Sequence, residues 1–327
     1  MKNFDYSDKL LKLQKVFKVC SVGLIFAVCS LQFAVLSGCQ NKKPFRSERV
    51  MMGTFVEVFS ADKRAPDIVF KEIERIENLL SKYKPESEIS QLNRLGKLAV
   101  SDDTFYIIKK AKEFSELSQG AFDITVAPLM DLWGFTDKNF VIPKDEDIKN
   151  ALTLVGSDKI ILHDDNNVVE FKTHGMKIDL GGIAKGYALD CAVKKLKENG
   201  INSCLLDAGG QIYGLGDDFF GRPWRIAIQT PRGKGIMGDL ELKNMSVSTS
   251  GDYEQYFEKN GKRYSHILDP RTGYPSDLGI VSVTVVAPEA LTADFLSTAV
   301  FVLGKVKGEQ LAKKFKDAGV RVVTKAK

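Results

Sequence analysis

Ser265-His266-Ile267-Leu268-Asp269-Pro270-Arg271-Thr272-Gly273 carries more chemistry than any other stretch of this 327-residue chain. It places an imidazole, a carboxylate, a guanidinium and two hydroxyls around a turn. Pro270 lacks a backbone N–H and Gly273 suits positive φ, so the segment predicts an ordered loop and excludes a core strand. Such a polar loop either binds a ligand or is a structural turn in which Asp269 and Arg271 pair with each other.

A second segment, Asp179-Leu180-Gly181-Gly182-Ile183-Ala184-Lys185-Gly186, is predicted to lead from a short strand into a helix. Glycines at that corner allow backbone N–H groups to approach a ligand, and a helix N-terminus favours phosphate. Lys185 falls in the first turn, where the helix dipole disfavours a cation, so it faces either water or an anionic partner. The segment is not a Walker A loop, because the Gly-Lys-Ser/Thr ending is absent.

A third segment, Ala293-Asp294-Phe295-Leu296-Ser297-Thr298, lies on a predicted helix. Asp294, Ser297 and Thr298 are three and four residues apart, so their oxygens share one helix face. A carboxylate with hydroxyl oxygens suits a hard cation such as Mg²⁺. The alternative is that the hydroxyls bond back to carbonyl groups of their own helix.

Three weaker candidates complete the set. Met52-Gly53-Thr54 puts a glycine inside a strand predicted over 50–59, which suggests a close approach of ligand or backbone. Tyr83 ends a predicted helix at a loop, where its ring could stack on a planar ligand. Ala121-Phe122-Asp123 offers an aromatic ring beside a carboxylate. Each of these is also compatible with a core or capping role.

Strands and helices alternate without a regular βαβ repeat, so the predicted fold class is α+β. Residues 84–96 read as a polar loop and 120–135 as a folded loop with short helical turns. The predicted helices cover 66–83, 103–118, 183–199, 288–303 and 309–316. The predicted strands cover 50–59, 159–162, 168–171, 176–180, 203–207, 224–228, 239–242, 245–248, 263–268, 280–286 and 320–323.

The first 38 residues have the order of a secretory signal: a lysine-rich start, an apolar run over 19–35, and Leu36-Ser37-Gly38-Cys39. The last four residues resemble a lipobox, in which Cys39 is lipidated. The alternative is a transmembrane anchor. Both place the folded part outside the cytoplasm, with 39–47 as a polar tether and 48–327 as the folded domain. Five lysines and two aspartates lie in 1–38, so the net charge falls from +5 to +2 and gives no electrostatic case for nucleic acid.

Together these stretches resemble the ApbE family of flavin transferases. The resemblance rests on six stretches in the family's order, namely 52–54, 120–123, 179–186, Thr249-Ser250-Gly251-Asp252-Tyr253, 265–273 and 293–298. It implies mixed sheets with flanking helices and an FAD site in a cleft between two lobes. It also implies a Mg²⁺-dependent transferase that splits FAD, attaches FMN to a threonine of an acceptor protein and releases AMP.

Residue by residue, the resemblance implies an FAD site made by Met52, Tyr83, Ala121, Phe122, Asp123, Asp179, Lys185 and Ile267. It implies a metal site made by the Gly182 carbonyl, Asp294 and Thr298. Ser297 stands where some relatives carry Asp, and Gln211 stands where Asn or Asp is expected. His266 is the candidate base for the acceptor hydroxyl, because an imidazole titrates near neutral pH.

Two alternative functions stay open from the sequence: an FAD pyrophosphatase that forms FMN and AMP, and a non-catalytic flavin-binding lipoprotein. The family suggests acceptors with an Asp-[Ser/Thr]-Gly-Ala-Thr-like site, such as membrane redox subunits. The lipobox-like sequence predicts a lipoprotein that is anchored to a membrane and faces the periplasm.

Overall fold

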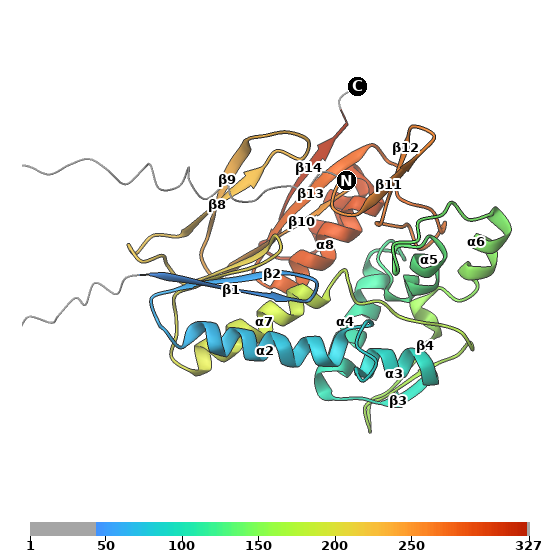
Figure 1. Ribbon diagram of the computed structural model, residues 1–327, viewed down its shortest axis with the longest axis horizontal. Helices are drawn as coiled ribbons and strands as arrows, with labels where there is room; N and C mark the ends of the chain where they lie inside the picture. Colours follow the sequence, from blue (N-terminus) through green and yellow to red (C-terminus); the bar gives the residue numbers. More distant parts are fainter. Residues whose placement is uncertain (1–43, 326–327) are drawn as a thin grey trace, which may run out of the picture. The chain divides into compact units, whose positions relative to one another are not determined.

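The computed structural model describes residues 44–325, which belong to one compact unit. The predicted signal segment and Cys39 lie outside the described residues. Within residues 44–325, no helix has the length and apolar character needed to cross a membrane. The mixture of helices and antiparallel sheets confirms the predicted α+β class (Figure 1).

A seven-stranded sheet forms the centre of the fold, and every neighbouring pair in it is antiparallel. β13 is rich in β-branched residues and is buried along nearly its whole length, as a central strand covered on both faces should be. In sheet order the strands are β1 (Phe45–Met51), β2 (Thr54–Ser60), β6 (Cys204–Ala208), β7 (Gln211–Leu215), β10 (Met245–Gly251), β13 (Ile280–Ala287) and β14 (Gly319–Thr324).

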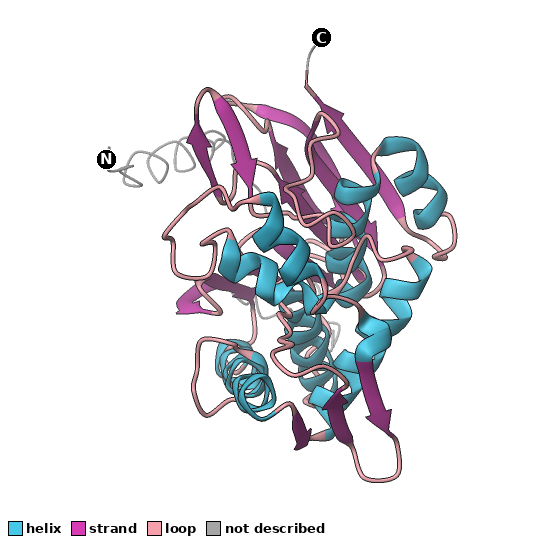
Figure 2. Cartoon of the chain, turned by 90° about the vertical axis from the view of Figure 1, so that its right-hand side faces the viewer, coloured by secondary structure: helices cyan, strands magenta, loops and turns pink. Residues whose placement is uncertain are grey.

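Helices cover one face of this sheet and form the main core with it (Figure 2). In α2, Val69, Ile73, Ile76 and Leu80 recur at helical spacing and are all buried, which explains why the sequence pattern predicts this helix. α8 is buried on nearly all sides and lies at the centre of the group. The helices are α2 (Ala65–Leu80), α4 (Asp102–Leu117), α7 (Ala184–Glu198), α8 (Ala290–Leu303) and α9 (Lys305–Ala312).

A hairpin packs on the opposite face of the sheet through a separate cluster centred on Trp224, Leu242 and Val247. It is made by β8 (Trp224–Gln229) and β9 (Ile236–Leu242). A three-stranded sheet, ordered β3-β5-β4, consists of β3 (Lys97–Ala99), β5 (Val168–Phe171) and β4 (Ile160–His163). Helix α3 (Glu88–Leu95) precedes β3 in the chain.

A second, smaller core contains Leu129, Trp133, Phe135, Ile148 and Leu268. Leu268 belongs to the polar loop quoted first, so that loop is anchored by its own apolar residue. The elements that contribute to this core or pack against it are α5 (Ala127–Leu132), α6 (Asp145–Leu152), β11 (Tyr256–Lys259) and β12 (Lys262–Ser265).

The turn at the end of this loop has both features that its sequence predicts. Gly273 has φ +80°, and a Cβ there would lie 2.5 Å from Ile148. Arg271 donates two side-chain hydrogen bonds to Asp269, at 2.8 and 2.7 Å. The pair therefore holds the turn, while the residues before it are free to form part of a site.

The single strand predicted over 50–59 is wrong, because this region is the β1–β2 hairpin. Met52 and Gly53 form its two-residue turn with φ of 50° and 73°, the geometry of a type I′ turn. The hairpin also shortens the predicted tether, since main-chain pairing with β2 begins at Phe45 rather than after Ser47.

Two other expectations are corrected. The polar loop predicted over 84–96 contains helix α3, which Ser87 caps at its start and Gly96 ends in the left-handed conformation. The strand predicted over 176–180 is absent. There the side-chain amide of Asn93 bonds both backbone groups of Ile178, at 2.7 and 2.9 Å, and so replaces a neighbouring strand.

Candidate active site

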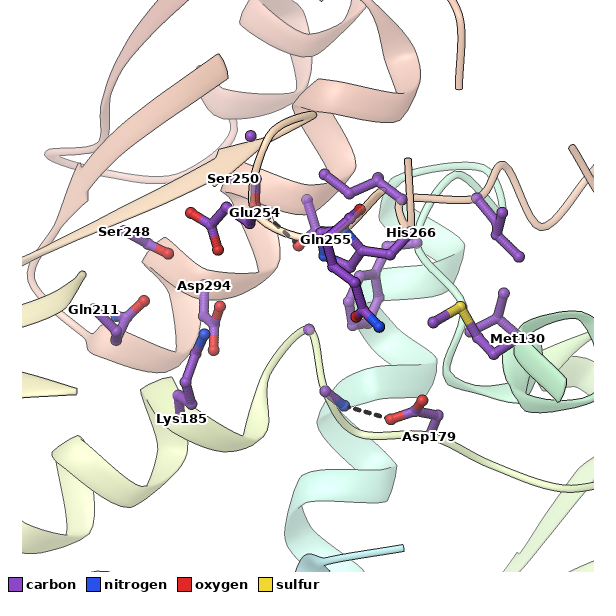
Figure 3. Close-up of a pocket in the computed structure, with 18 of the residues that line it drawn as sticks. Met130, Asp179, Lys185, Gln211, Ser248, Ser250, Glu254, Gln255, His266 and Asp294 are labelled. Atoms are coloured by element: carbon purple, nitrogen blue, oxygen red, sulfur yellow. Dashed lines mark hydrogen bonds between the residues drawn. The ribbon is translucent and has the colours of Figure 1, made fainter. Parts of the chain in front are cut away.

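A cavity of about 310 Å³ lies where the large core and the small core meet. Its walls include most of the residues predicted for the site (Figure 3). These are Tyr83, Ala121, Phe122, Asp123, Asp179, Gly182, Lys185, His266, Ile267, Asp294 and Thr298. The volume is within the range of small-molecule sites.

The centre of the cavity is set by the crossing of α7 and α8. Gly186 lies in the first turn of α7, and a Cβ on it would be only 2.3 Å from the Ala290 carbonyl oxygen. The backbone N–H of Gly186 donates to the carboxylate of Asp294 on α8, at 3.0 Å. The carboxylate of Asp190 on α7 accepts from the first two N–H groups of α8, both at 2.8 Å. These contacts bring Lys185 and Asp294 to the same part of the cavity.

The Gly186–Asp294 hydrogen bond also affects Gly182. In a continuing helix, the Gly186 N–H would donate to the Gly182 carbonyl, four residues earlier. Because it donates to Asp294 instead, no backbone N–H of residues 44–325 donates to that carbonyl. Gly182 also packs against Thr298, whose hydroxyl oxygen would be 3.5 Å from a Cβ at this position.

A metal could therefore be held by a carboxylate, a hydroxyl and a free carbonyl at one place. Residues 44–325 contain no cluster of three or more His, Cys, Asp or Glu side chains that could hold a metal, so the donors must be mixed. Asp294 is 5% exposed, and burial raises the pKa of its carboxyl group while Lys185 and the Gly186 N–H lower it. Three hard oxygen donors with room for other ligands fit Mg²⁺.

Ser297 occupies a different position from the other predicted metal residues. It is fully buried, and its hydroxyl donates to the Asp294 carbonyl at 2.9 Å. It also bonds the hydroxyls of Ser250 and Ser248, at 2.8 and 3.2 Å. Ser297 is therefore placed behind the cavity wall, where it links α8 to β10.

Asp179 is held at the opposite side of the site. It forms an ion pair with Lys82 at 2.8 Å, and both side chains are largely buried. Its second oxygen accepts from the Gly181 N–H at 2.8 Å, which fixes the turn that leads into α7. Tyr83 is 67% exposed at the rim, in a position to cover a planar ligand.

Four predicted FAD residues differ in what they offer. Ala121 and Phe122 present buried apolar surface to the cavity. The Asp123 carboxylate is already used, since it accepts from Thr125 at 2.9 and 2.6 Å and from Ser157 at 2.8 Å. Met52 lies outside the cavity lining, in the β1–β2 turn, where its N–H donates to Glu77.

His266 is oriented by the backbone of the preceding segment. Its ring Nδ1 lies 3.0 Å from the Gln255 carbonyl oxygen, which also accepts from the His266 N–H at 3.0 Å. Because a carbonyl only accepts, Nδ1 carries a proton, and in the neutral ring Nε2 is left with a free lone pair. Burial lowers the pKa of His266 below its ordinary 6.5. This keeps the ring neutral and able to take a proton.

Sequence reasoning missed several lining residues, among them Ser248, Glu254 and Gln255. Burial raises the pKa of the Glu254 carboxyl group, and the nearby Lys185 opposes that rise. Glu254 and Gln255 directly follow the 249–253 stretch quoted for the resemblance, which is the signal that could have identified them. Gln211 also lines the cavity.

Comparison with known proteins connects this geometry with one family. Residues 52–323 match the model of the ApbE family. An FAD:protein FMN transferase of Klebsiella pneumoniae is 34% identical over 292 residues, which cover 87% of this chain and 90% of the relative. The crystal structure of an ApbE protein from Thermotoga maritima has a TM-score of 0.80 and 36% identity, covering 86% and 94% of the two chains. The flavin transferase ApbE from Vibrio cholerae has a TM-score of 0.77 and 30% identity, covering 87% and 95%.

Proposed function

This chain belongs to the ApbE family and is an FAD:protein FMN transferase, and from this premise we propose that the transfer uses Mg²⁺ and a threonine hydroxyl as acceptor. The hydroxyl oxygen forms a bond to the phosphorus of the FMN half of FAD. The bond from that phosphorus to the bridging oxygen breaks, and AMP leaves with the bridging oxygen. The hydroxyl proton passes to a base on the protein.

One observation carries the metal part of this proposal: the Gly182 carbonyl, which accepts from no backbone N–H of residues 44–325, lines the same cavity as Asp294, Thr298 and Lys185. When bound there, Mg²⁺ would neutralise charge on the pyrophosphate oxygens. Lys185 lies at the N-terminus of α7 and has no ion pair or hydrogen bond among the described residues. Its ammonium group is therefore free to bind a phosphate.

His266 is the residue that we propose takes the acceptor proton. Its Nε2 is unprotonated in the neutral ring because Nδ1 donates to Gln255. The ring lines the same cavity as Lys185 and Asp294, so a hydroxyl bound between them can be reached. Ile267, next to it, supplies buried apolar surface for the flavin.

The test combines the purified protein with FAD, Mg²⁺ and an acceptor containing an Asp-[Ser/Thr]-Gly-Ala-Thr-like site. A fluorescent acceptor band in a gel is the expected result, and EDTA should abolish it. His266→Ala should bind FAD and lose transfer. His163→Ala is the matched control, because His163 is exposed in β4 and pairs with Glu170.

Other outcomes would redirect the proposal. Release of free FMN and AMP without a labelled acceptor would show a pyrophosphatase in which water replaces the hydroxyl. Unchanged FAD would show a flavin-binding lipoprotein. Transfer at the normal rate by His266→Ala would remove His266 from the mechanism.

We further propose that the acceptors are membrane redox subunits and that the protein is lipid-anchored through Cys39, facing the periplasm. The support is the lipobox-like sequence and the apolar run before it. Cells that express the full chain should incorporate labelled palmitate into it, and Cys39→Ser should abolish that label. A label that persists in the variant would contradict this assignment.

A further inference from the structure

Gln211 is a buried polar residue at the start of β7 that the proposed chemistry does not yet use. It is 2% exposed, and its side chain lines the cavity next to Asp294 and Lys185. It follows the Gly209-Gly210 turn, and Gly209 lines the cavity as well. The side chain is therefore part of the wall that faces the bound ligand.

The hydrogen bonds of Gln211 fix which end of its amide faces the cavity. Nε2 donates to the Ala290 carbonyl and to the Ser246 hydroxyl, both at 3.1 Å. The Ala290 carbonyl can only accept, so the nitrogen must be on that side. Ser246 donates its own proton to the Ile212 carbonyl at 2.7 Å, so it too accepts from Gln211. The amide cannot be flipped without breaking both bonds.

This arrangement leaves Oε1 as a fixed acceptor without a donor. Oε1 is buried and has no hydrogen-bond partner in the described structure. A buried acceptor without a partner is unfavourable, and native proteins rarely contain one without a reason. Figure 3 draws two charged residues of the same cavity close to Gln211, namely Asp294, which cannot donate when ionised, and Lys185.

We propose that Gln211 is a ligand-binding residue whose Oε1 accepts a hydrogen bond from an O–H group of the bound substrate complex. The inference rests on the proposed function. Two sources supply this donor: a hydroxyl of FAD, or a water on the metal at Asp294 and Thr298. Mg²⁺ keeps several waters in protein sites, and these waters donate to neighbouring carbonyl oxygens.

The test compares Gln211→Met with the matched control Ser246→Ala. The methionine keeps the volume and removes the acceptor. The control removes one partner of Nε2 and leaves Oε1 in place, so it reproduces the structural part of the change only. FAD affinity is measured by flavin fluorescence in EDTA, and Mg²⁺ half-saturation is measured by its effect on FAD binding. If the methionine variant does not fold, Gln211→Ala replaces it in the test, because a water can then donate to the Ala290 carbonyl.

We expect Gln211→Met to weaken one of these two quantities about five- to tenfold, as loss of one hydrogen bond predicts. Weaker FAD binding in EDTA identifies a hydroxyl of FAD as the donor. An unchanged FAD affinity in EDTA with a higher Mg²⁺ half-saturation identifies a metal-bound water. Gln211→Ala should shift the same quantity about threefold.

Two results would overturn the inference: no change in either quantity, or an equal change in Ser246→Ala, which would assign Gln211 a purely structural role. Failure of the proposed function gives a different pattern. The wild-type protein itself would then bind no FAD or show no response to Mg²⁺.

Discussion

Gly186→Ala tests whether the α7–α8 crossing sets the geometry of the site. The added Cβ would lie 2.3 Å from the Ala290 oxygen, 2.6 Å from its carbonyl carbon and 2.8 Å from the Leu291 Cα. All three atoms are backbone, so no side chain can move aside. Ordinary contact begins near 3.4 Å, and α7 must therefore move away from α8 by about 1 Å.

The same movement stretches the 3.0 Å hydrogen bond from the Gly186 N–H to Asp294. Overpacking of this kind costs about 1–3 kcal/mol, and the better helix propensity of alanine offsets up to about 1 kcal/mol. We expect a net loss of about 1–2 kcal/mol and a fall in Tm of about 4 °C. A misplacement of about 1 Å at reacting groups costs about 100-fold in rate, so flavin transfer should fall by about that factor.

Gly308→Ala provides a matched control, because Gly308 also packs against α8. A Cβ on Gly308 in α9 would lie 2.5 Å from the Val300 Cγ1 and 3.0 Å from the Val300 Cα, in the C-terminal half of α8. Neither residue lines the cavity. Thermal unfolding and the rate of acceptor labelling are measured for both variants. If both variants lose a similar amount in Tm but only Gly186→Ala loses transfer, the α7–α8 crossing sets the geometry of the site. Wild-type transfer by Gly186→Ala, or an equal loss of rate in both, would refute it.

Three further predictions concern charged groups. Lys82→Met leaves Asp179 buried without its partner, so the free energy of unfolding, measured with urea, should fall by about 3 kcal/mol and FAD should bind more weakly. The control is Lys97→Met, which breaks an exposed ion pair. It should lower the free energy of unfolding by less than about 1 kcal/mol. Burial raises the pKa of Asp190 from 3.8 to about 7, so the folded state binds this proton more tightly than the unfolded state does. The free energy of unfolding should therefore fall as the pH rises from 4 to 7. Asp190→Asn should make the free energy of unfolding less dependent on pH over that range. Burial lowers the pKa of His266 below 6.5, so kcat/KM should fall on acidification only below pH 6.5. A fall in kcat/KM that begins above pH 6.5 would exclude His266 as the base.

The elements that sequence predicts well are those with a buried stripe at a clear period. α2 is one example, because its apolar residues recur along one face that packs on the sheet. α3 was missed because only two of its residues, Ile89 and Leu92, are buried, which is too few to show a helical repeat of apolar residues. Its capping residues are the stronger signal. The β1–β2 hairpin was missed because a Met-Gly turn lacks the usual Asn-Gly or Asp-Gly signature.

In the candidate site, the sequence identified side chains but not the positions of backbone groups. Helical spacing identified the Asp294 face, and the glycine corner identified Lys185, because both depend on neighbours in the chain. What sequence could not provide is the position of backbone groups. The Gly182 carbonyl is free only because α8 takes the Gly186 N–H, and His266 has its tautomer only because the Gln255 carbonyl lies 3.0 Å away.

These two backbone contacts lie at the junction of the two cores, where we propose that the reaction takes place. The large core fixes α7 against α8, and thereby Lys185, the proposed phosphate-binding residue, against Asp294, the proposed metal-binding residue. The small core fixes the 265–273 loop through Leu268, close in the chain to His266, the proposed base on that same loop. A shift between the cores would therefore change the distance from His266 to Lys185 and leave each half of the site intact. Such a change should slow transfer to the acceptor more than it weakens FAD binding, because only the transfer step needs both halves at once.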